Sequence, residues 1–141
     1  MRLFPLSAAA LTTALFASPL FAGGHVAKGE KIVHTKCKIC HSIYNGDDVI
    51  LKGGKIGPNL FGILGRVAGH AEGYDHSKTL IEAGDKGLAW DEAQLADYIG
   101  DTKVFLKAYL GREDEIYSRM SYRVKDEEDR KAIAAYLATL Q

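Results

Sequence analysis

Apolar side chains recur at helical spacing in five segments of the chain. The first segment runs from Val26 to Cys40 and predicts a helix that carries both cysteines on one side near its C-terminal end. His41 then lies where this helix ends. The last segment begins at Asp126 and has the clearest apolar stripe, formed by Ile133, Tyr136, Leu137 and Leu140.

Three shorter helices are predicted between these two from their capping residues. Their expected bounds are Ser77 to Gly84, Asp91 to Gly100, and Asp101 or Thr102 to Gly111. The second of them opens with a capping-box pattern, because Gln94 follows Asp91 by three residues. No convincing alternating strand pattern is found, so the predicted fold class is all-α.

Residues 45–73 are rich in glycine and show little periodicity of either kind. An irregular stretch of this length in a compact domain usually wraps around something or carries function. Four or five short helices joined by long glycine-rich loops also bury little apolar surface for a chain of 141 residues. A large, flat, apolar cofactor at the centre would supply the missing core.

The first residues of the chain have the layout of a secretory signal peptide. A single positive charge at Arg2 precedes an apolar stretch, and Pro19 and Ala22 come before a pair of glycines. This predicts cleavage after Ala22, a single globular domain over residues 23–141, and export to the periplasm. An uncleaved anchor helix is the alternative, because no Asp, Glu, Lys or Arg lies between Arg2 and Lys28.

The charges of the chain are balanced, with 18 Lys and Arg against 18 Asp and Glu. A protein that binds nucleic acid without sequence preference needs a dense basic surface to contact phosphates. We therefore expect no nucleic-acid partner.

The two cysteines of the chain, Cys37 and Cys40, are followed directly by His41. A redox dithiol, half of a zinc site and covalent haem attachment all use this spacing. A thioredoxin-like dithiol needs a βαβ setting, and a structural zinc site needs four ligands, yet neither a βαβ pattern nor a second ligand pair is found. Covalent haem is favoured, because two thiols can add to the two vinyl groups of the porphyrin while His41 is delivered to the iron.

A haem held in this way needs a second axial ligand. The mature chain would contain one methionine, Met120, just before the last helix. A lone methionine often only fills a gap in the core. Met120 is instead flanked by Ser118, Arg119 and Ser121, a polar setting that favours ligation, and a His/Met pair raises the potential as an electron carrier requires.

With these residues in place, the chain resembles a class I cytochrome c over essentially its whole mature length. The resemblance runs in order through the segments GEKIVHTKCKICH, GGKIGPNLFGILGR, EGYDHSKTLIEAG, GLAWDEAQLADYI, FLKAYLG, YSRMSYRV and AAYLATL. Within that family the chain is most similar to the larger c2-type cytochromes of purple bacteria and their relatives. The fold that the resemblance implies is one of short helices and long loops wrapped around a single covalently attached haem.

The resemblance also implies roles for residues around the haem. Pro58 matches the residue whose carbonyl accepts the second N–H of the axial histidine. Arg66 and Trp90 match donors to a haem propionate, and Ser118 stands where the family has a hydroxyl near the propionate edge. His76 departs from the tyrosine of many relatives and can titrate. The apolar haem envelope is expected to include Phe61, Leu64, Tyr74, Leu95, Tyr98 and Leu110, whereas His25, His34 and His70 are expected on the surface.

The implied function is a soluble, monomeric one-electron carrier of respiration or photosynthesis, and not an enzyme. The resemblance implies reduction by a cytochrome bc1-type complex and oxidation by a terminal oxidase or a photosynthetic reaction centre. Transient docking is expected through basic residues near the haem edge: Lys36, Lys38, Lys55, Lys103, Lys107, Arg119 and Arg123. The alternatives are a peroxidase or small-ligand sensor with an open sixth site, or the same carrier tethered by an uncleaved N-terminal helix.

Overall fold

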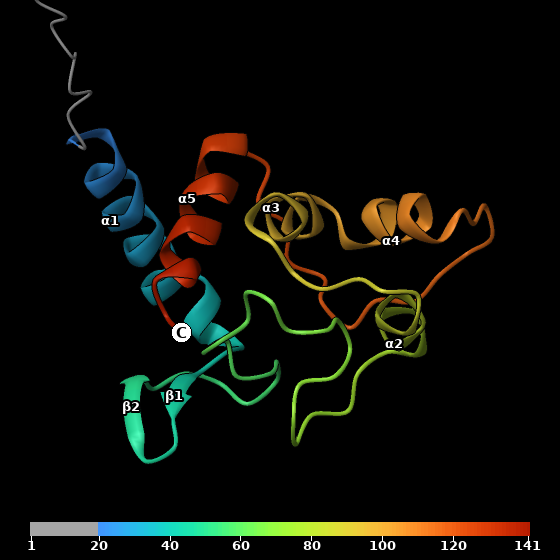
Figure 1. Ribbon diagram of the computed structural model, residues 1–141, viewed down its shortest axis with the longest axis horizontal. Helices are drawn as coiled ribbons and strands as arrows, with labels where there is room; N and C mark the ends of the chain where they lie inside the picture. The colour runs from blue at the N-terminus through green and yellow to red at the C-terminus, as the bar shows by residue number, and fades with distance from the viewer. Residues whose placement is uncertain (1–19) are drawn as a thin grey trace, which may run out of the picture.

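Five α-helices and one short hairpin make up residues 20–141, the part of the chain that the computed structural model describes. The helices are α1 (Leu20–Thr35), α2 (Lys78–Asp85), α3 (Glu92–Gly100), α4 (Thr102–Leu110) and α5 (Glu127–Ala138). A short 3-10 helix, η1 (Cys37–Ile39), follows α1, and the strands β1 (Ile43–Asn45) and β2 (Asp48–Leu51) pair antiparallel. Figure 1 shows α1 and α5 side by side at one end of the molecule and α2 and α4 at the other.

The predicted signal peptide lies outside the described residues, except for residues 20–22, which begin α1. Within residues 20–141 no helix is both long and apolar enough to cross a bilayer.

The capping residues begin four of the helices, as the sequence predicts. Ser77, Asp91, Asp101 and Asp126 each accept a hydrogen bond from a backbone N–H of the first turn, and Asp91 and Gln94 form the full capping box. These side chains satisfy amide donors that have no partner within the helix. The predicted helices and the all-α class are confirmed.

Two local features differ from the sequence prediction. The cysteines do not lie on the long helix, because α1 ends at Thr35 and Cys37 already belongs to η1. The β1–β2 hairpin was not predicted, because strands of three and four residues are too short to show an alternating pattern. Its turn depends on Gly46, whose φ of 58° is a left-handed conformation that glycine adopts without strain.

The long helices cross at a glycine. A Cβ atom built on Gly29 of α1 would lie 1.9 Å from the carbonyl oxygen of Ala132 in α5, so only glycine allows this approach. The buried core continues from this crossing to α3 and α4, and its largest fully buried side chains are Val33, Ile43, Leu88, Leu106 and Ile133. The helices therefore frame one side of the molecule, while residues 52–77 close the other side as loop (Figure 1).

Candidate functional site

A mostly apolar cavity occupies the space between the helices and the 52–77 loop. Its empty volume is about 1460 Å³, counting the part that opens to solvent. Cys37, Cys40, His41 and Met120 all line it. The residues predicted to hold a haem directly are thus brought together from segments some 80 positions apart in the chain.

The imidazole of His41 is fixed by one hydrogen bond. Its Nδ1 lies 2.8 Å from the carbonyl oxygen of Pro58. A carbonyl oxygen can only accept, so Nδ1 carries the proton and Nε2 keeps the lone pair that a metal needs. Burial of the ring lowers the pKa of His41, which also favours the neutral, ligating form.

Glycines allow the surrounding backbone to approach this histidine, a feature that sequence reasoning missed. A Cβ built on Gly57 would lie 2.3 Å from Cε1 of the His41 ring, and one on Gly53 would lie 1.9 Å from the His41 carbonyl oxygen. Real side chains never come so close. The signal in the sequence was the position of Gly57 directly before Pro58, in the run of glycines that follows the hairpin.

The two cysteines are half-buried and are not joined to each other. Burial, reinforced by the neighbouring Cys40, raises the pKa of Cys37 to about 11. Reactive redox dithiols have a lowered thiol pKa, so this environment is the opposite of a thioredoxin-like site. Among residues 20–141 no group of three His, Cys, Asp or Glu side chains is arranged to hold a metal ion, as a zinc site would require.

Met120 is held through its backbone. Its carbonyl oxygen accepts hydrogen bonds from Thr102 Oγ1 at 3.1 Å and from Ser118 Oγ at 3.3 Å. Ser118 is not itself a lining residue of the cavity, so its hydroxyl contacts the site through the backbone of Met120. Thr102 is 3% exposed. The sequence analysis named it only as a possible helix start and not as a site residue, because it lies 18 positions from Met120 in the chain.

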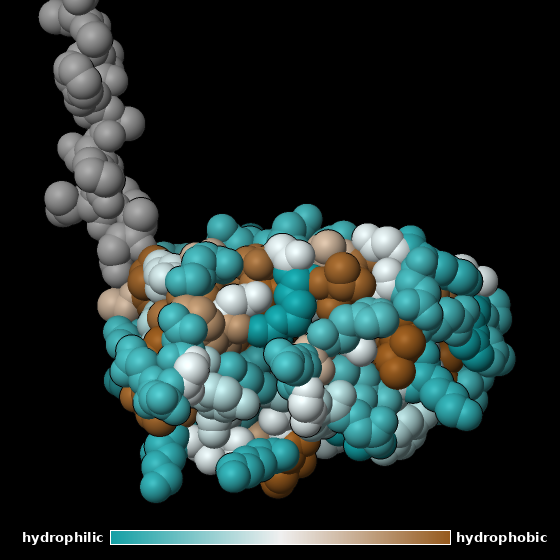
Figure 2. Space-filling view, turned by 60° about the horizontal axis from the view of Figure 1, so that its bottom comes forward, coloured by the Kyte–Doolittle hydropathy of each residue, from teal (hydrophilic) through white to brown (hydrophobic). Residues whose placement is uncertain are grey.

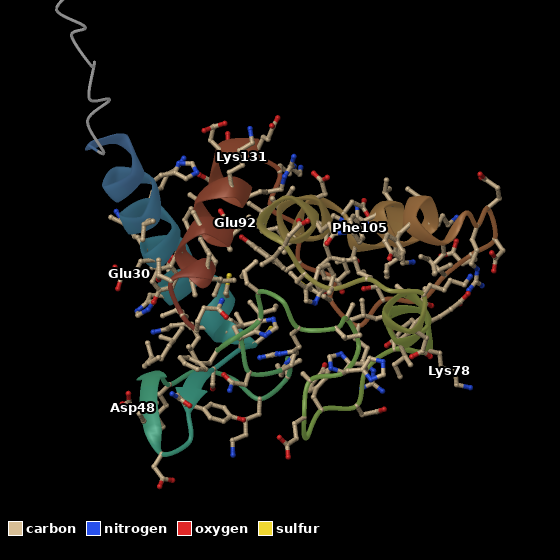
Figure 3. The ribbon with its side chains drawn as sticks, viewed as in Figure 1. Glu30, Asp48, Lys78, Glu92, Phe105 and Lys131 are labelled. Carbon is tan, nitrogen blue, oxygen red and sulfur yellow. The ribbon has the colours of Figure 1, made fainter. Side chains whose placement is uncertain are left out.

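Arg66 and Trp90, which both line the cavity, are neighbours across paired backbone segments. The Trp90 N–H donates to the Arg66 carbonyl at 3.0 Å, and the Trp90 carbonyl accepts from Gly65 N–H at 2.7 Å. The Trp90 ring packs against Tyr98 of α3 and against Phe105, which reaches from α4 toward α3 (Figure 3).

The guanidinium of Arg66 donates to the backbone carbonyls of Asn59 and Phe61. Burial lowers its pKa, and in the described part of the chain it makes no ion pair with a carboxylate. A half-buried cation without an anion fits a cofactor that carries carboxylates of its own.

His76 also lines the cavity and is held as an acceptor. Its Nε2 accepts the Ala71 N–H at 3.2 Å, and its ring meets the edge of Tyr74 with centroids 4.7 Å apart. Nδ1 therefore carries the proton of the neutral ring. Burial first, and then the charges of His70, Arg66 and Arg119, lower the pKa of His76.

The predicted apolar envelope is only partly found. Tyr74, Leu95 and Tyr98 line the cavity, whereas Phe61, Leu64 and Leu110 pack against the core instead. Apolar lining residues that the sequence analysis missed include Ile39, Ile56, Leu80, Tyr122 and Val124. Figure 2 shows one face of the molecule, on which apolar side chains form separate brown patches bordered by polar ones.

The basic residues expected around the haem edge fall into two groups. Lys103 pairs with Glu115 at 2.9 Å and Arg123 with Asp101 at 3.1 Å, while Arg119 pairs with Asp75. Lys107 donates to the carbonyl oxygen of Glu113 at 3.2 Å. In residues 20–141 no ion pair is formed by the remaining three: Lys36, Lys38 and Lys55.

The chain is similar to known proteins over most of its length, although no protein-family model matches it. It is 40% identical to cytochrome c-551 of Roseobacter denitrificans over 134 residues, which cover 94% of this chain and 93% of that protein. It is 39% identical to cytochrome c2 of Rhodobacter capsulatus over 136 residues, or 96% of each chain. The solved structure of cytochrome c2 from Rhodobacter sphaeroides matches with a TM-score of 0.76 at 36% identity, covering 81% of this chain and 94% of that one.

Proposed function

Because the chain belongs to the class I cytochromes c and is most similar to the c2 type, we propose that it is a periplasmic one-electron carrier with His41 and Met120 as axial ligands. Proteins of this family carry electrons rather than catalyse reactions, and they hold one covalently attached c-type haem. When bound, the haem supplies an iron that passes between ferric and ferrous by exchanging one electron, with no bond made or broken.

The observation that carries the proposal is that Cys37, Cys40, His41 and Met120 line one cavity. In this proposal the two thiols form the thioethers. Pro58 holds the His41 ring with Nε2 free to ligate, and the hydroxyls of Thr102 and Ser118 hold the Met120 backbone in place. The apolar wall excludes water, which stabilises the uncharged methionine as a ligand.

Arg66 and Trp90 are the proposed donors to the haem propionates. Arg66 lines the cavity, and within residues 20–141 its guanidinium has only backbone carbonyls as partners, so a propionate would supply the counter-charge. Two acidic groups of a bound haem would otherwise be costly to bury.

The proposed route of the electron is from a cytochrome bc1-type complex to a terminal oxidase or a photosynthetic reaction centre. Such partners are membrane complexes reached from the periplasm, which fits the predicted signal peptide over residues 1–22. The proposed docking surface contains the basic residues beside the cavity, of which Lys36 and Arg119 are also lining residues.

An absorption spectrum of the purified holoprotein tests the axial ligands. We expect the weak far-red band of thioether-to-iron ligation in the oxidised protein and a single reversible one-electron wave in voltammetry. A high-spin spectrum that changes on addition of cyanide or peroxide within seconds would instead assign the protein to the peroxidase or sensor alternative. A matched Met120→Leu variant, which keeps the volume of the side chain, should lose the band.

A further inference from the structure

The segment that carries Met120, residues 113–123, is held without a backbone ladder. Within residues 20–141, none of its N–H or carbonyl groups takes part in a backbone–backbone hydrogen bond. Segments with few such bonds are the ones that open at a low free-energy cost. The position of Met120 therefore depends on contacts made by side chains.

Two ion pairs tie this segment to helix α4 and to the residue before it. Lys103 of α4 pairs with Glu115 at 2.9 Å. Arg123 pairs at 3.1 Å with Asp101, the residue that caps α4. Both contacts lie on the same side of Met120, so by themselves they would let the segment swing about α4.

A third ion pair leads in another direction. The guanidinium of Arg119, which lines the cavity directly before Met120, pairs with the carboxylate of Asp75. Among the ion pairs and hydrogen bonds that residues 113–123 make within the described chain, this pair alone reaches residues 71–76.

The residue before Asp75 is anchored on the histidine side of the cavity. The Tyr74 hydroxyl donates to the Ile56 carbonyl at 2.7 Å. Ile56 stands two residues before Pro58, whose carbonyl accepts from His41 Nδ1 at 2.8 Å. Asp75 is therefore part of a loop that is fixed to the backbone around His41.

From these contacts we propose that Tyr74, Asp75 and Arg119 form a loop bridge, which links the backbone that holds His41 to the backbone that carries Met120. Asp75 and Arg119 are positioning residues, because they restrain the methionine segment on the side that α4 does not reach. Breaking the bridge raises the population in which the segment has moved away and a small ligand such as imidazole can replace the methionine. This inference rests on the proposed function, since it concerns how Met120 is kept as an axial ligand.

The expected effect is moderate, because the pair is exposed. The side chains of Arg119 and Asp75 are 43% and 83% exposed, and surface ion pairs of this kind shift an equilibrium by roughly two- to five-fold at most. Lys103 and Glu115 have the same exposed fractions and involve the same segment, but neither lines the cavity. This second pair is therefore a matched control.

The test measures imidazole binding to the oxidised holoprotein, followed by loss of the far-red band. Asp75→Asn and Arg119→Gln should each lower the dissociation constant of imidazole roughly two- to five-fold. Glu115→Gln should leave it nearly unchanged, because the segment keeps its other attachments to α4. The double variant Asp75→Asn with Arg119→Gln should bind imidazole no more tightly than the more sensitive single variant, because no ion pair is left for the second substitution to remove.

Hydrogen exchange separates positioning from general stability and does not depend on ligand binding. In Asp75→Asn, backbone amides in peptides covering residues 117–122 should exchange roughly two- to five-fold faster by mass spectrometry, while the melting temperature changes little. Raising the ionic strength from about 10 mM to about 1 M should bring the wild-type protein closer to this variant, because the screening length falls from roughly 30 Å to 3 Å.

Three results would overturn the proposal. Wild-type imidazole affinity and exchange in Asp75→Asn would show that the pair does not restrain the segment. Fully additive effects of the Asp75 and Arg119 substitutions would show that the two residues act separately, and an equal effect of Glu115→Gln would remove the special place of this pair. Failure of the proposed function is separate, because the wild-type protein would then lack the far-red band, and hydrogen exchange would still decide whether the bridge holds residues 117–122.

Discussion

The backbone of Gly57 lies in contact with the imidazole of His41, so that an added Cβ would stand 2.3 Å from Cε1, 2.5 Å from Nδ1 and 2.7 Å from Nε2. The same segment supplies the Pro58 carbonyl that holds Nδ1. We therefore predict that Gly57→Ala tilts the ring or displaces the loop, at a cost of about 1–3 kcal/mol of stability. Thermal unfolding and the yield of holoprotein measure this effect.

Gly24→Ala is the matched control for this substitution. Gly24 has no atom within 4 Å of the added Cβ and would be the second residue of a mature chain that begins at Gly23, so alanine there should leave the melting temperature nearly unchanged. A Gly57→Ala variant with the melting temperature and visible spectrum of the wild type would contradict the close packing of this backbone against His41.

Covalent attachment predicts that colour stays with the polypeptide after denaturation. Protein treated with acid and organic solvent should keep its haem on Cys37 and Cys40, and the double substitution Cys37→Ala with Cys40→Ala should yield a poorly folded chain by circular dichroism. The reason is that the cavity of about 1460 Å³ would otherwise remain without the cofactor that fills it. Extraction of haem into the solvent from the wild-type protein would refute the thioether linkage.

The hydroxyl of Thr102 is predicted to keep Met120 in position for ligation. Thr102→Val conserves shape but leaves the Met120 carbonyl with the bond from Ser118 alone, a loss of about 1 kcal/mol. Added imidazole should then displace the methionine at lower concentration, seen as loss of the far-red band. Met120→Ala should remove that band entirely and lower the potential, whereas an unchanged band would mean that Met120 is not a ligand.

The lowered pKa of His76 predicts that the protein loses stability on mild acidification. Burial lowers the pKa of His76 in the folded protein below its ordinary value of 6.5. Above pH 6.5 the ring is neutral in both the folded and the unfolded protein, so its contribution to stability does not change with pH. Below pH 6.5 His76 is protonated in the unfolded chain but stays neutral in the folded one. The free energy of unfolding therefore falls by up to about 1.4 kcal/mol per pH unit until the folded pKa is reached. His76→Tyr should flatten the melting temperature between pH 6.5 and 5, and an identical slope in both proteins would assign the effect to other groups.

Local chemistry explains which parts of this structure could be predicted from the sequence. A capping side chain such as Asp91 accepts a hydrogen bond from an N–H only three residues away, so the start of its helix can be predicted from neighbouring residues in the sequence. The covalent haem of the family could be predicted because the spacing of Cys37, Cys40 and His41 suits attachment through two thiols beside an imidazole.

Long-range pairing explains what the sequence could not predict. Arg119 and Asp75 stand 44 positions apart, and Lys103 and Glu115 stand 12 apart, so only the fold brings these ion pairs together. For this reason the sequence analysis could not distinguish the paired from the unpaired among the seven basic residues expected around the haem edge. The cavity wall likewise includes Ile39 and Ile56, whose flanking lysines gave them the pattern of ordinary loop residues.

The crossing of α1 and α5 should be the most sensitive point of the fold outside the cavity. Alanine at position 29 would place its Cβ 1.9 Å from the Ala132 carbonyl oxygen and 2.5 Å from the carbonyl carbon, and neither atom belongs to a flexible side chain. The helices must therefore separate, which exposes the packing around Val33 and Ile133. The clash should destabilise the protein by about 3 kcal/mol, and the higher helix propensity of alanine offsets only about 1 kcal/mol of this. Gly29→Ala should therefore lower the melting temperature by several degrees. Gly24→Ala, five residues earlier, makes the same substitution without the clash, and equal melting temperatures for the two variants would contradict the close crossing.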